Sequence, residues 1–481
     1  MKALNEILKS VKIIQIKGDV DKYVSKICLS TDSVIKDCLF VAIKGNNTDG
    51  HNYIDKAISL GASVILCENL PQDINYKTTY ILIKDTRDSL GICSANFFNK
   101  PSEKIKLVGI TGTNGKTSIA TLLYNLFNSL NIKSGLISTI HNIVDEEILP
   151  SKLTTPNPIE INFLLKKMVD RNCEYCFMEV SSHGISQKRI SGLNFVCGVF
   201  SNLSRDHLDY HKNFEDYILT KKKFFDSFSE NSLAIINNDD PYCQTMIKDC
   251  VSKKIFYGLS KESNYFGEVI NSTLNGIKMK INNLIIDTKI AGQFNVYNLL
   301  ATFSVASELT NYPIHLNMSL LKKVPGRFNI INSHKGVIGI IDYAHSPDAL
   351  EKIFETINSL RERKQKIITV LGCGGNRDVG KRPIMGEISY CNSDISIFTS
   401  DNPRYEKIEK IIIDMQSNIK EEENRKLICI HDRYEAIKKA SDLAQRDDII
   451  LILGKGHEDY QEIYGEKKPF DDFKVLTKIL K

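Results

Sequence analysis

The chain has 481 residues, of which 42% are hydrophobic and 25% charged, a composition typical of soluble globular proteins. The net charge of +5 comes from lysines scattered along the chain, so nucleic acid is not indicated as a partner. No apolar run reaches the roughly 18 residues of a membrane span, and the N-terminus does not resemble a signal peptide, so we expect a cytoplasmic protein.

Residues 1–101 alternate short strands with helices and are expected to form the first of three domains. Apolar patterning predicts a helix and a strand within 1–19, buried strands at 38–45, 62–69 and 80–85, and helices at 53–61 and 87–99. The last helix runs into Lys100-Pro101, which marks the boundary.

Residues 102–328 are expected to form the central domain. Nearly continuous apolar runs at 175–182 and 195–204 predict buried parallel strands, and 298–309 predicts a helix. Prolines and threonines predict a loop over 149–161. The boundary is expected at 324–329, where Pro-Gly would end the preceding helix.

Residues 329–481 start a new alternation and are expected to form the third domain. Strands are predicted at 337–343, 366–375, 395–401, 427–430 and 448–456. A helix is predicted at 347–363. Strands separated by helices predict doubly wound α/β sheets.

The twelve cysteines are mostly single residues within apolar stretches, and we expect them to be reduced. Cys173 and Cys176 form one Cys-x-x-Cys pair. Because neither a second pair nor a nearby histidine pair accompanies it, two small core residues are favoured over a zinc site.

The stretch 107–120, LVGITGTNGKTSIA, combines an apolar strand, a Gly-rich turn and a helix start, which predicts a phosphate-binding loop. Lys116 would neutralise the β and γ phosphates, and the Thr117 hydroxyl would bind Mg²⁺. The expected ATP-binding loop residues are Gly112, Thr113, Asn114, Gly115, Lys116 and Thr117. Ile110 stands where standard loops have glycine, so the register differs from that of transport ATPases and GTPases.

Two further features are candidates for metal binding. Glu179 ends an apolar strand, at the edge where α/β proteins form ligand sites, and predicts a metal carboxylate, although it could instead cap a helix. His207 and His211 are four residues apart, but the segment offers no third zinc ligand, so zinc is not favoured.

The motif TGTNGKT at 111–117 is the signature of the Mur ligase family and its folylpolyglutamate synthase relatives, and the resemblance extends over nearly the whole chain. It implies a central P-loop ATPase-like parallel sheet with helices on both faces, a Rossmann-like α/β C-terminal domain and a smaller α/β N-terminal domain. Family members use ATP and Mg²⁺ to form an acyl phosphate, which an amine then attacks. The resemblance also implies that His207 orients or binds a hard cation.

In the family, the stretch that resembles 207–221 carries a lysine that CO₂ converts to a carbamate. The match in this sequence is Lys221, with Lys222 and Lys223 as alternatives if the register shifts. A carbamate would offer oxygen ligands to a second Mg²⁺, and a buried, neutral amine would favour its formation. The implied catalytic residues are thus Lys116, Glu179, His207 and Lys221.

The segment FVAIKGNNTDGHNYI resembles the uridine-binding segment of the branch that makes the UDP-MurNAc-tripeptide. The implied contacts of the UDP-MurNAc-dipeptide are Leu29, Thr31, Asn46, Asn47, Thr48, Thr154, Thr155, Ser181, Gln187 and Arg189. Asp32 stands where this branch usually has arginine, which changes the detailed uridine contacts.

Further segments resemble the family's ATP and amino-acid sites. The implied ATP contacts outside the loop are Asn295, Asn298, Arg327, Asp342 and His345. Three third-domain segments are most similar to those of diaminopimelate-adding members and imply contacts at Arg377, Asp401, Asn402, Pro403, Arg404, Gly454 and Glu458. Arg404 can bind the distal carboxylate of diaminopimelate and Glu458 its ammonium, whereas lysine would lack a partner for the arginine.

The resemblance therefore implies a monomeric ligase of peptidoglycan synthesis. It would add meso-2,6-diaminopimelate to the D-Glu γ-carboxylate of UDP-MurNAc-L-Ala-D-Glu. The alternatives are a ligase that adds lysine, a folylpolyglutamate synthase-like enzyme, or a P-loop ATPase without ligase activity. The third-domain DNPR motif and the first-domain DGHNYI segment favour the first interpretation.

Overall fold

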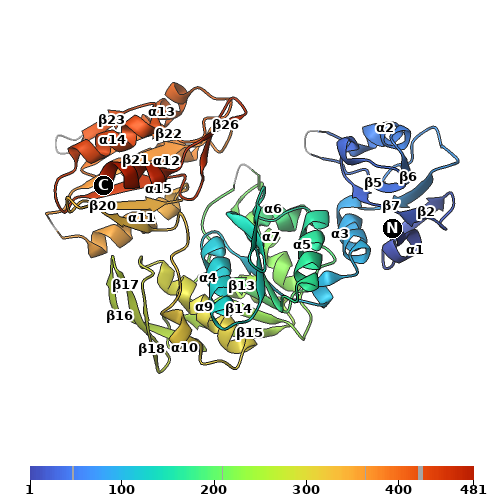
Figure 1. Ribbon diagram of the computed structural model, residues 1–481, viewed down its shortest axis with the longest axis horizontal. Coiled ribbons are helices and arrows are strands. Elements are labelled where there is room, and N and C mark those ends of the chain that lie inside the picture. The colour runs from blue at the N-terminus through green and yellow to red at the C-terminus, as the bar shows by residue number, and fades with distance from the viewer. Residues whose placement is uncertain (46–47, 208–209, 363, 421–425) are drawn as a thin grey trace.

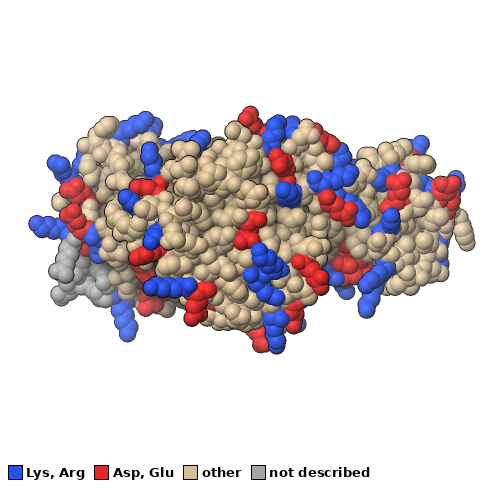
Figure 2. All heavy atoms as spheres, turned by 90° about the horizontal axis from the view of Figure 1, so that it is seen from below, with Lys and Arg blue, Asp and Glu red and all other residues tan. Residues whose placement is uncertain are grey.

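The computed structural model describes residues 1–45, 48–207, 210–362, 364–420 and 426–481. Three α/β domains follow one another along the chain, from the blue N-terminal domain to the orange and red C-terminal domain (Figure 1). Among the described residues, none of the helices combines the length and apolarity that a membrane span requires. On the face shown in Figure 2, basic and acidic side chains are interspersed rather than gathered into one basic patch.

The N-terminal domain is built on a five-stranded sheet. Its strand order is β2 (Ile13–Lys17), β7 (Thr79–Ile83), β6 (Ala62–Cys67), β5 (Cys38–Val41) and β4 (Ile27–Cys28), parallel except for β2. Its helices are α1 (Leu4–Ile7), α2 (Ile54–Ser59) and α3 (Thr86–Phe97), and β1 (Lys2–Ala3) pairs with β3 (Tyr23–Val24). The strands and helices expected in this domain are confirmed.

An eleven-stranded sheet forms the central domain. The strand order is β11 (Glu147–Pro150), β10 (His141–Val144), β9 (Ser134–Ile137), β12 (Tyr175–Glu179), β8 (Lys106–Thr111), β13 (Cys197–Phe200), β14 (Leu233–Asn237), β15 (Lys253–Gly258), β16 (Tyr265–Thr273), β17 (Gly276–Ile281) and β18 (Leu284–Thr288). The seven strands from β9 to β16 are parallel, as expected, whereas β10, β11, β17 and β18 add antiparallel ends.

Helices cover both faces of the central sheet because alternate strand residues point to opposite sides. On β8, Val108 and Ile110 pack towards α4 (Lys116–Ser129), α9 (Asn295–Leu309) and α10 (Ile314–Met318). Leu107 packs on the other face, towards α5 (Pro158–Asp170), α7 (Phe214–Asp226) and α8 (Cys243–Ile247). The short helix α6 (Ser182–Ser186) follows β12. Cys173 and Cys176 are buried within this second core.

The third domain has a six-stranded sheet. Its order is β19 (Asn329–Asn332), β20 (Ile338–Asp342), β24 (Ile449–Leu453), β21 (Ile367–Cys373), β22 (Ile395–Ser400) and β23 (Lys426–Cys429), with β19 antiparallel to the rest. The helices are α11 (Pro347–Leu360), α12 (Lys381–Cys391), α13 (Ile408–Gln416), α14 (Arg433–Leu443) and α15 (Asp472–Leu480), and β25 (Tyr460–Ile463) and β26 (Glu466–Pro469) form a hairpin.

Two local expectations in the central domain are wrong. The predicted loop 149–161 is shorter, because β11 extends to Pro150 and α5 starts at Pro158, where Asn157 caps the helix by accepting the Glu160 N–H. The helix before the third domain ends at Met318 instead of running up to the Pro-Gly turn. Proline and threonine content alone did not distinguish a helix N-terminus from a loop.

Candidate active site

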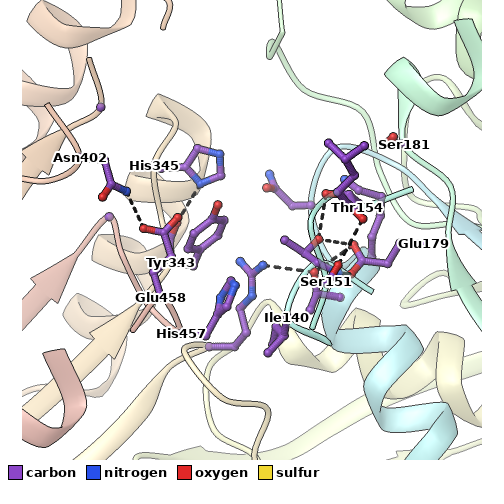
Figure 3. Close-up of a pocket in the computed structure, with 18 of the residues that line it drawn as sticks. Ile140, Ser151, Thr154, Glu179, Ser181, Tyr343, His345, Asn402, His457 and Glu458 are labelled. Atoms are coloured by element: carbon purple, nitrogen blue, oxygen red, sulfur yellow. Dashed lines mark hydrogen bonds between the residues drawn. The ribbon is translucent and has the colours of Figure 1, made fainter. Parts of the chain in front are cut away.

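A cavity of about 900 Å³ lies between the central and third domains. Figure 3 shows its two walls: Thr154, Glu179 and Ser181 belong to the central domain, and they face Asn402, Glu458 and His345 of the third domain. The carboxyl ends of parallel strands form both walls, which is where α/β sheets place ligand sites. The central and third domains, which the sequence predicts as separate units, thus contribute to one site.

The predicted phosphate loop connects β8 to α4 on the central wall. Gly112 has a φ of 145° and Gly115 a φ of 89°, so both glycines adopt backbone conformations that side chains disfavour. A Cβ at residue 112 would lie 1.9 Å from the Ser201 Oγ. The Lys116 ammonium donates to the carbonyls of Gly112 and Thr113, at 2.9 and 2.7 Å. Lys116 therefore lies within the curve of the loop, where phosphate oxygens would bind.

Glu179 and Thr117 meet at the floor of the cavity. The Thr117 hydroxyl donates to Glu179 Oε2 at 3.0 Å, and the Arg327 Nη2 donates to the same hydroxyl at 3.2 Å. The Thr139 backbone N–H donates to Glu179 Oε1 at 2.7 Å. Burial raises the pKa of the Glu179 carboxyl, while Lys116 and these hydrogen bonds lower it. A hydroxyl and a carboxylate at hydrogen-bond distance are the hard oxygen donors that Mg²⁺ prefers.

Lys221 lies beneath the phosphate loop, with 1% of its surface exposed. Its amine donates to the Gly112 carbonyl at 2.8 Å. Burial lowers the pKa of this amine well below its usual value, and the nearby Lys116 charge lowers it further. Lys222 instead pairs with Asp226 and Asp249 on another side of α7, so of these two lysines only Lys221 lines the cavity.

The segment before α7 brings His207 and Asp206 to the same wall. His207 Nε2 lies 3.5 Å from Asp206 Oδ2, and the His207 ring packs edge-on against His183, with 4.9 Å between centroids. Burial lowers the pKa of His207 to about 3, although Asp206 raises it. His207 is therefore neutral at physiological pH. His211 is buried beside Tyr217, 5.1 Å between ring centroids, and does not line the cavity.

Several residues that the resemblance assigns to the UDP-MurNAc-dipeptide line the same cavity as the proposed Mg²⁺ ligands. Thr154, Thr155, Ser181 and Arg189 line the cavity. The Arg189 guanidinium donates to the Thr155 carbonyl at 2.6 Å and to Gln187 Oε1 at 2.7 Å, which fixes its orientation. The residues assigned to the uridine end, Leu29, Thr31 and Thr48, lie in the N-terminal domain outside this cavity. Asn46 and Asn47 lie outside the described residues.

The residues assigned to ATP divide into two groups. Arg327 and His345 line the cavity, and Arg327 stacks on Tyr343, 4.6 Å from the ring centroid. Asn298 is buried and donates to Asn295 Oδ1 at 2.8 Å, beside the phosphate loop. Asp342 is also buried, and its two oxygens accept the N–H groups of Phe328 and Ala344, both at 2.7 Å. Asp342 thereby fixes the start of the third domain.

On the third-domain wall, the loop after β22 and the loop after β24 form one polar cluster. Asn402 Nδ2 donates to Glu458 Oε2 at 2.7 Å, and a Cβ at Gly454, where φ is 109°, would lie 2.6 Å from Asp401 Oδ2. The Arg404 guanidinium donates to the Gly375 carbonyl at 2.8 Å. Arg377 and Arg404 line the cavity with Asp401, Asn402, Gly454 and Glu458, whereas Pro403 does not.

Sequence reasoning missed residues that line this cavity, among them Thr139 and Lys381, and the fully buried Lys455, which contacts a lining residue without lining the cavity itself. Thr139 holds Glu179 but belongs to no motif, and Lys381 donates to the His345 carbonyl at 2.7 Å from the start of α12. Lys455 stands between two predicted residues in GKGHE, and its ammonium contacts Glu458. Its position in that motif was a usable signal, whereas Thr139 reaches the site only through the fold.

Three family models match the chain: "Mur ligase family, catalytic domain" over residues 26–102, "Mur ligase middle domain" over 110–306 and "Mur ligase, glutamate ligase domain" over 326–456. Curated relatives named UDP-N-acetylmuramoyl-L-alanyl-D-glutamate--2,6-diaminopimelate ligase include those of Phocaeicola vulgatus and Bacteroides thetaiotaomicron. They are 46% and 47% identical to this chain over 99% of both lengths. The chain belongs to the Mur ligase family.

Solved structures agree with this Mur ligase assignment. One with the same printed ligase name has a TM-score of 0.69 at 29% identity, and it covers 100% of this chain and 99% of its own. The MurF ligase of Thermotoga maritima in complex with ADP has a TM-score of 0.62 at 20% identity over 90% and 94% of the chains, which shows the shared fold alone. The family resemblance and the three-domain fold expected from the sequence are confirmed.

Proposed function

We propose that this Mur ligase cleaves ATP to join meso-2,6-diaminopimelate to the D-Glu γ-carboxylate of UDP-MurNAc-L-Ala-D-Glu, in peptidoglycan synthesis. One observation carries the proposal: a single cavity holds the phosphate loop on one wall and the Asp401–Arg404 loop with Glu458 on the other. Relatives at 46% and 47% identity over nearly the full length bear the name of that reaction.

In the first step, a γ-carboxylate oxygen attacks the γ-phosphorus, the bond to ADP breaks and an acyl phosphate forms. The Lys116 ammonium would exchange its two loop carbonyls for phosphate oxygens, and the loop N–H groups would bind the same anion. Catalysis here consists of positioning and charge stabilisation. Thr117, Glu179, His207 and a Lys221 carbamate would hold Mg²⁺, which would offset negative charge on the phosphoryl group.

In the second step, the diaminopimelate amine attacks the acyl carbon, and the tetrahedral intermediate releases phosphate as the amine gives up a proton. The Arg404 guanidinium, whose Nη1 donates to the Gly375 carbonyl and whose Nε lies 3.4 Å from Glu462 Oε2, would turn its remaining N–H groups to the distal carboxylate of diaminopimelate. The Glu458 carboxylate would accept a hydrogen bond from the distal ammonium of diaminopimelate. Lysine carries only the ammonium at that end, so Arg404 would disfavour it.

Lys221 is proposed to carry the carbamate. Its nitrogen would form a bond to the carbon of CO₂ and release a proton, which requires the neutral amine that burial and Lys116 favour. We expect Lys221→Ala to lose activity, and short-chain carboxylic acids to restore part of it. Lys222→Ala, a change at the next residue of the same helix, is the matched control and should keep activity. Full activity in Lys221→Ala would contradict the assignment.

The remaining assignments are proposed on the family resemblance. They comprise UDP-MurNAc-dipeptide contacts in the N-terminal domain and on the central wall, ATP contacts at Asn295, Asn298, Arg327, Asp342 and His345, domain boundaries at 101 and 328, a monomer and a cytoplasmic location. The Asn114 amide donates to Asp348 Oδ2 of α11 at 2.7 Å, so the phosphate loop already contacts the third domain. This contact supports closure of the third domain over the nucleotide.

The decisive experiment measures phosphate release from ATP with UDP-MurNAc-L-Ala-D-Glu and either meso-diaminopimelate or L-lysine. We expect phosphate release only when UDP-MurNAc-L-Ala-D-Glu and diaminopimelate are both present. Release with lysine instead would retain the ligase and refute the role of Arg404. Release without either substrate would indicate a plain ATPase and refute the substrate assignments.

A further inference from the structure

Lys455 is a fully buried cation for which the proposed reaction has no use. It follows β24, and its ammonium lies 2.9 Å from Glu458 Oε2 and 3.9 Å from Asp401 Oδ1. It also lies 3.2 Å from Asn402 Oδ1, to which it donates a hydrogen bond. All three partners are residues proposed to bind diaminopimelate. Burying a charge is unfavourable unless partners offset it, so this lysine and its carboxylates depend on one another.

The two oxygens of Glu458 have different surroundings. Oε2 accepts hydrogen bonds from Lys455 and, at 2.7 Å, from the Asn402 amide. Within the described residues, Oε1 has no hydrogen-bond donor, and Glu458 lines the cavity. A carboxylate whose one oxygen is held in this way presents the other in a fixed direction. The geometry therefore offers Oε1 to an ammonium group of a ligand.

Charges around Glu458 make its ionisation depend on Lys455. Burial and the Asp401 carboxylate raise the pKa of Glu458, whereas Lys455 and Asn402 lower it. The other titratable or charged groups that face this pair are Arg433, Tyr343, His457 and Tyr460. Arg433 is paired with Asp472, and burial lowers the pKa of His457 to about 3, so His457 is neutral. Lys455 is thus the cation in direct contact with Glu458.

We propose that Lys455 is a positioning residue for diaminopimelate, which holds Glu458 ionised and directs its second oxygen towards the distal ammonium. This inference rests on the proposed function. Without the lysine, the buried Asp401 carboxylate and the partly buried Glu458 carboxylate would lack their shared cation, and Glu458 would take up a proton at higher pH. A protonated Glu458 has no charge with which to attract an ammonium.

The test compares the wild-type enzyme with Lys455→Met and with Lys467→Met as the matched control. Both lysines lie over the Tyr460 ring, with the Lys455 ammonium 5.6 Å and the Lys467 ammonium 3.9 Å from its centroid, but Lys467 is exposed and does not line the cavity. Steady-state phosphate release gives KM for diaminopimelate, ATP and the nucleotide across a range of pH.

We expect Lys455→Met to raise KM for diaminopimelate about 10- to 100-fold at neutral pH, as for loss of a charged hydrogen bond. The KM values for ATP and for UDP-MurNAc-L-Ala-D-Glu should change little. Binding needs ionised Glu458, so it is lost as pH falls through the pKa of that group. Because removal of Lys455 raises this pKa, the acid limb of kcat/KM for diaminopimelate should move to higher pH. Lys467→Met should match the wild type.

A double variant separates positioning from folding. Glu458→Gln with Lys455→Met removes both charges, and its KM should equal that of Glu458→Gln alone and lose the acid limb. The inference would be overturned if the two substitutions raised KM for diaminopimelate additively. It would also be overturned if Lys455→Met kept the wild-type KM, or raised KM by the same factor at every pH. A wild-type enzyme that releases no phosphate with diaminopimelate would overturn the proposed function and this inference with it.

Discussion

Substitution of Gly454 by alanine tests whether the exact placement of Asp401 matters for diaminopimelate. Gly454 has a φ of 109°, and its added Cβ would lie 2.6 Å from Asp401 Oδ2 and 3.1 Å from the Gly372 carbonyl. The backbone strain should destabilise the fold by about 1–2 kcal/mol, or roughly 2–8 °C in the unfolding transition of a domain of this size. Relief of the contact must displace the Asp401 carboxylate.

Gly336→Ala is the matched control, because it introduces similar strain in the same domain. Gly336 has a φ of 83°, and the added Cβ would meet the flexible side chain of Arg446 at 2.9 Å, away from the cavity lining. Differential scanning calorimetry should show a comparable loss of stability in both variants. Steady-state phosphate release should show a higher KM for diaminopimelate in Gly454→Ala alone, by about tenfold or more. Equal KM values in the two variants would refute the reasoning.

Three further substitutions test separate parts of the structure. Arg404→Met should raise KM for diaminopimelate about 10- to 100-fold in the same assay and leave KM for ATP near the wild-type value; an equal rise in KM for ATP would contradict a contact specific to the diaminopimelate carboxylate. Arg433→Met leaves the buried Asp472 unpaired and should lower the free energy of unfolding by about 3–5 kcal/mol in urea titrations, whereas Lys253→Met, which removes an exposed ion pair, should change it by less than about 1 kcal/mol. Lys116→Met should slow phosphate release about 100- to 1,000-fold while the thermal transition persists, and release near the wild-type rate would exclude it from the reaction.

The sequence by itself determined the local elements and the identity of the phosphate loop. Buried parallel strands such as β12 and β13 are nearly continuous in apolar residues, and the loop places Gly112 and Gly115 where positive φ values occur. Both signals are local, because each depends on the conformations that a few neighbouring residues can adopt. The antiparallel pairing of β16 with β17 did have a local signal in Asn275-Gly276, a dipeptide typical of tight hairpin turns, but the sequence interpretation did not use it.

Only the tertiary structure decided which residues share the cavity and in what electrostatic state. From the sequence, three consecutive lysines were alternatives for the carbamate position. The structure distinguishes two of them, because the Lys221 amine is buried against the Gly112 carbonyl, whereas Lys222 pairs with Asp249. Lys455 likewise gains its contacts with Asp401 and Glu458 from the apposition of two loops that follow different strands. Burial and the distance between charges set a side chain's ionisation, and neither is a property of the sequence around it.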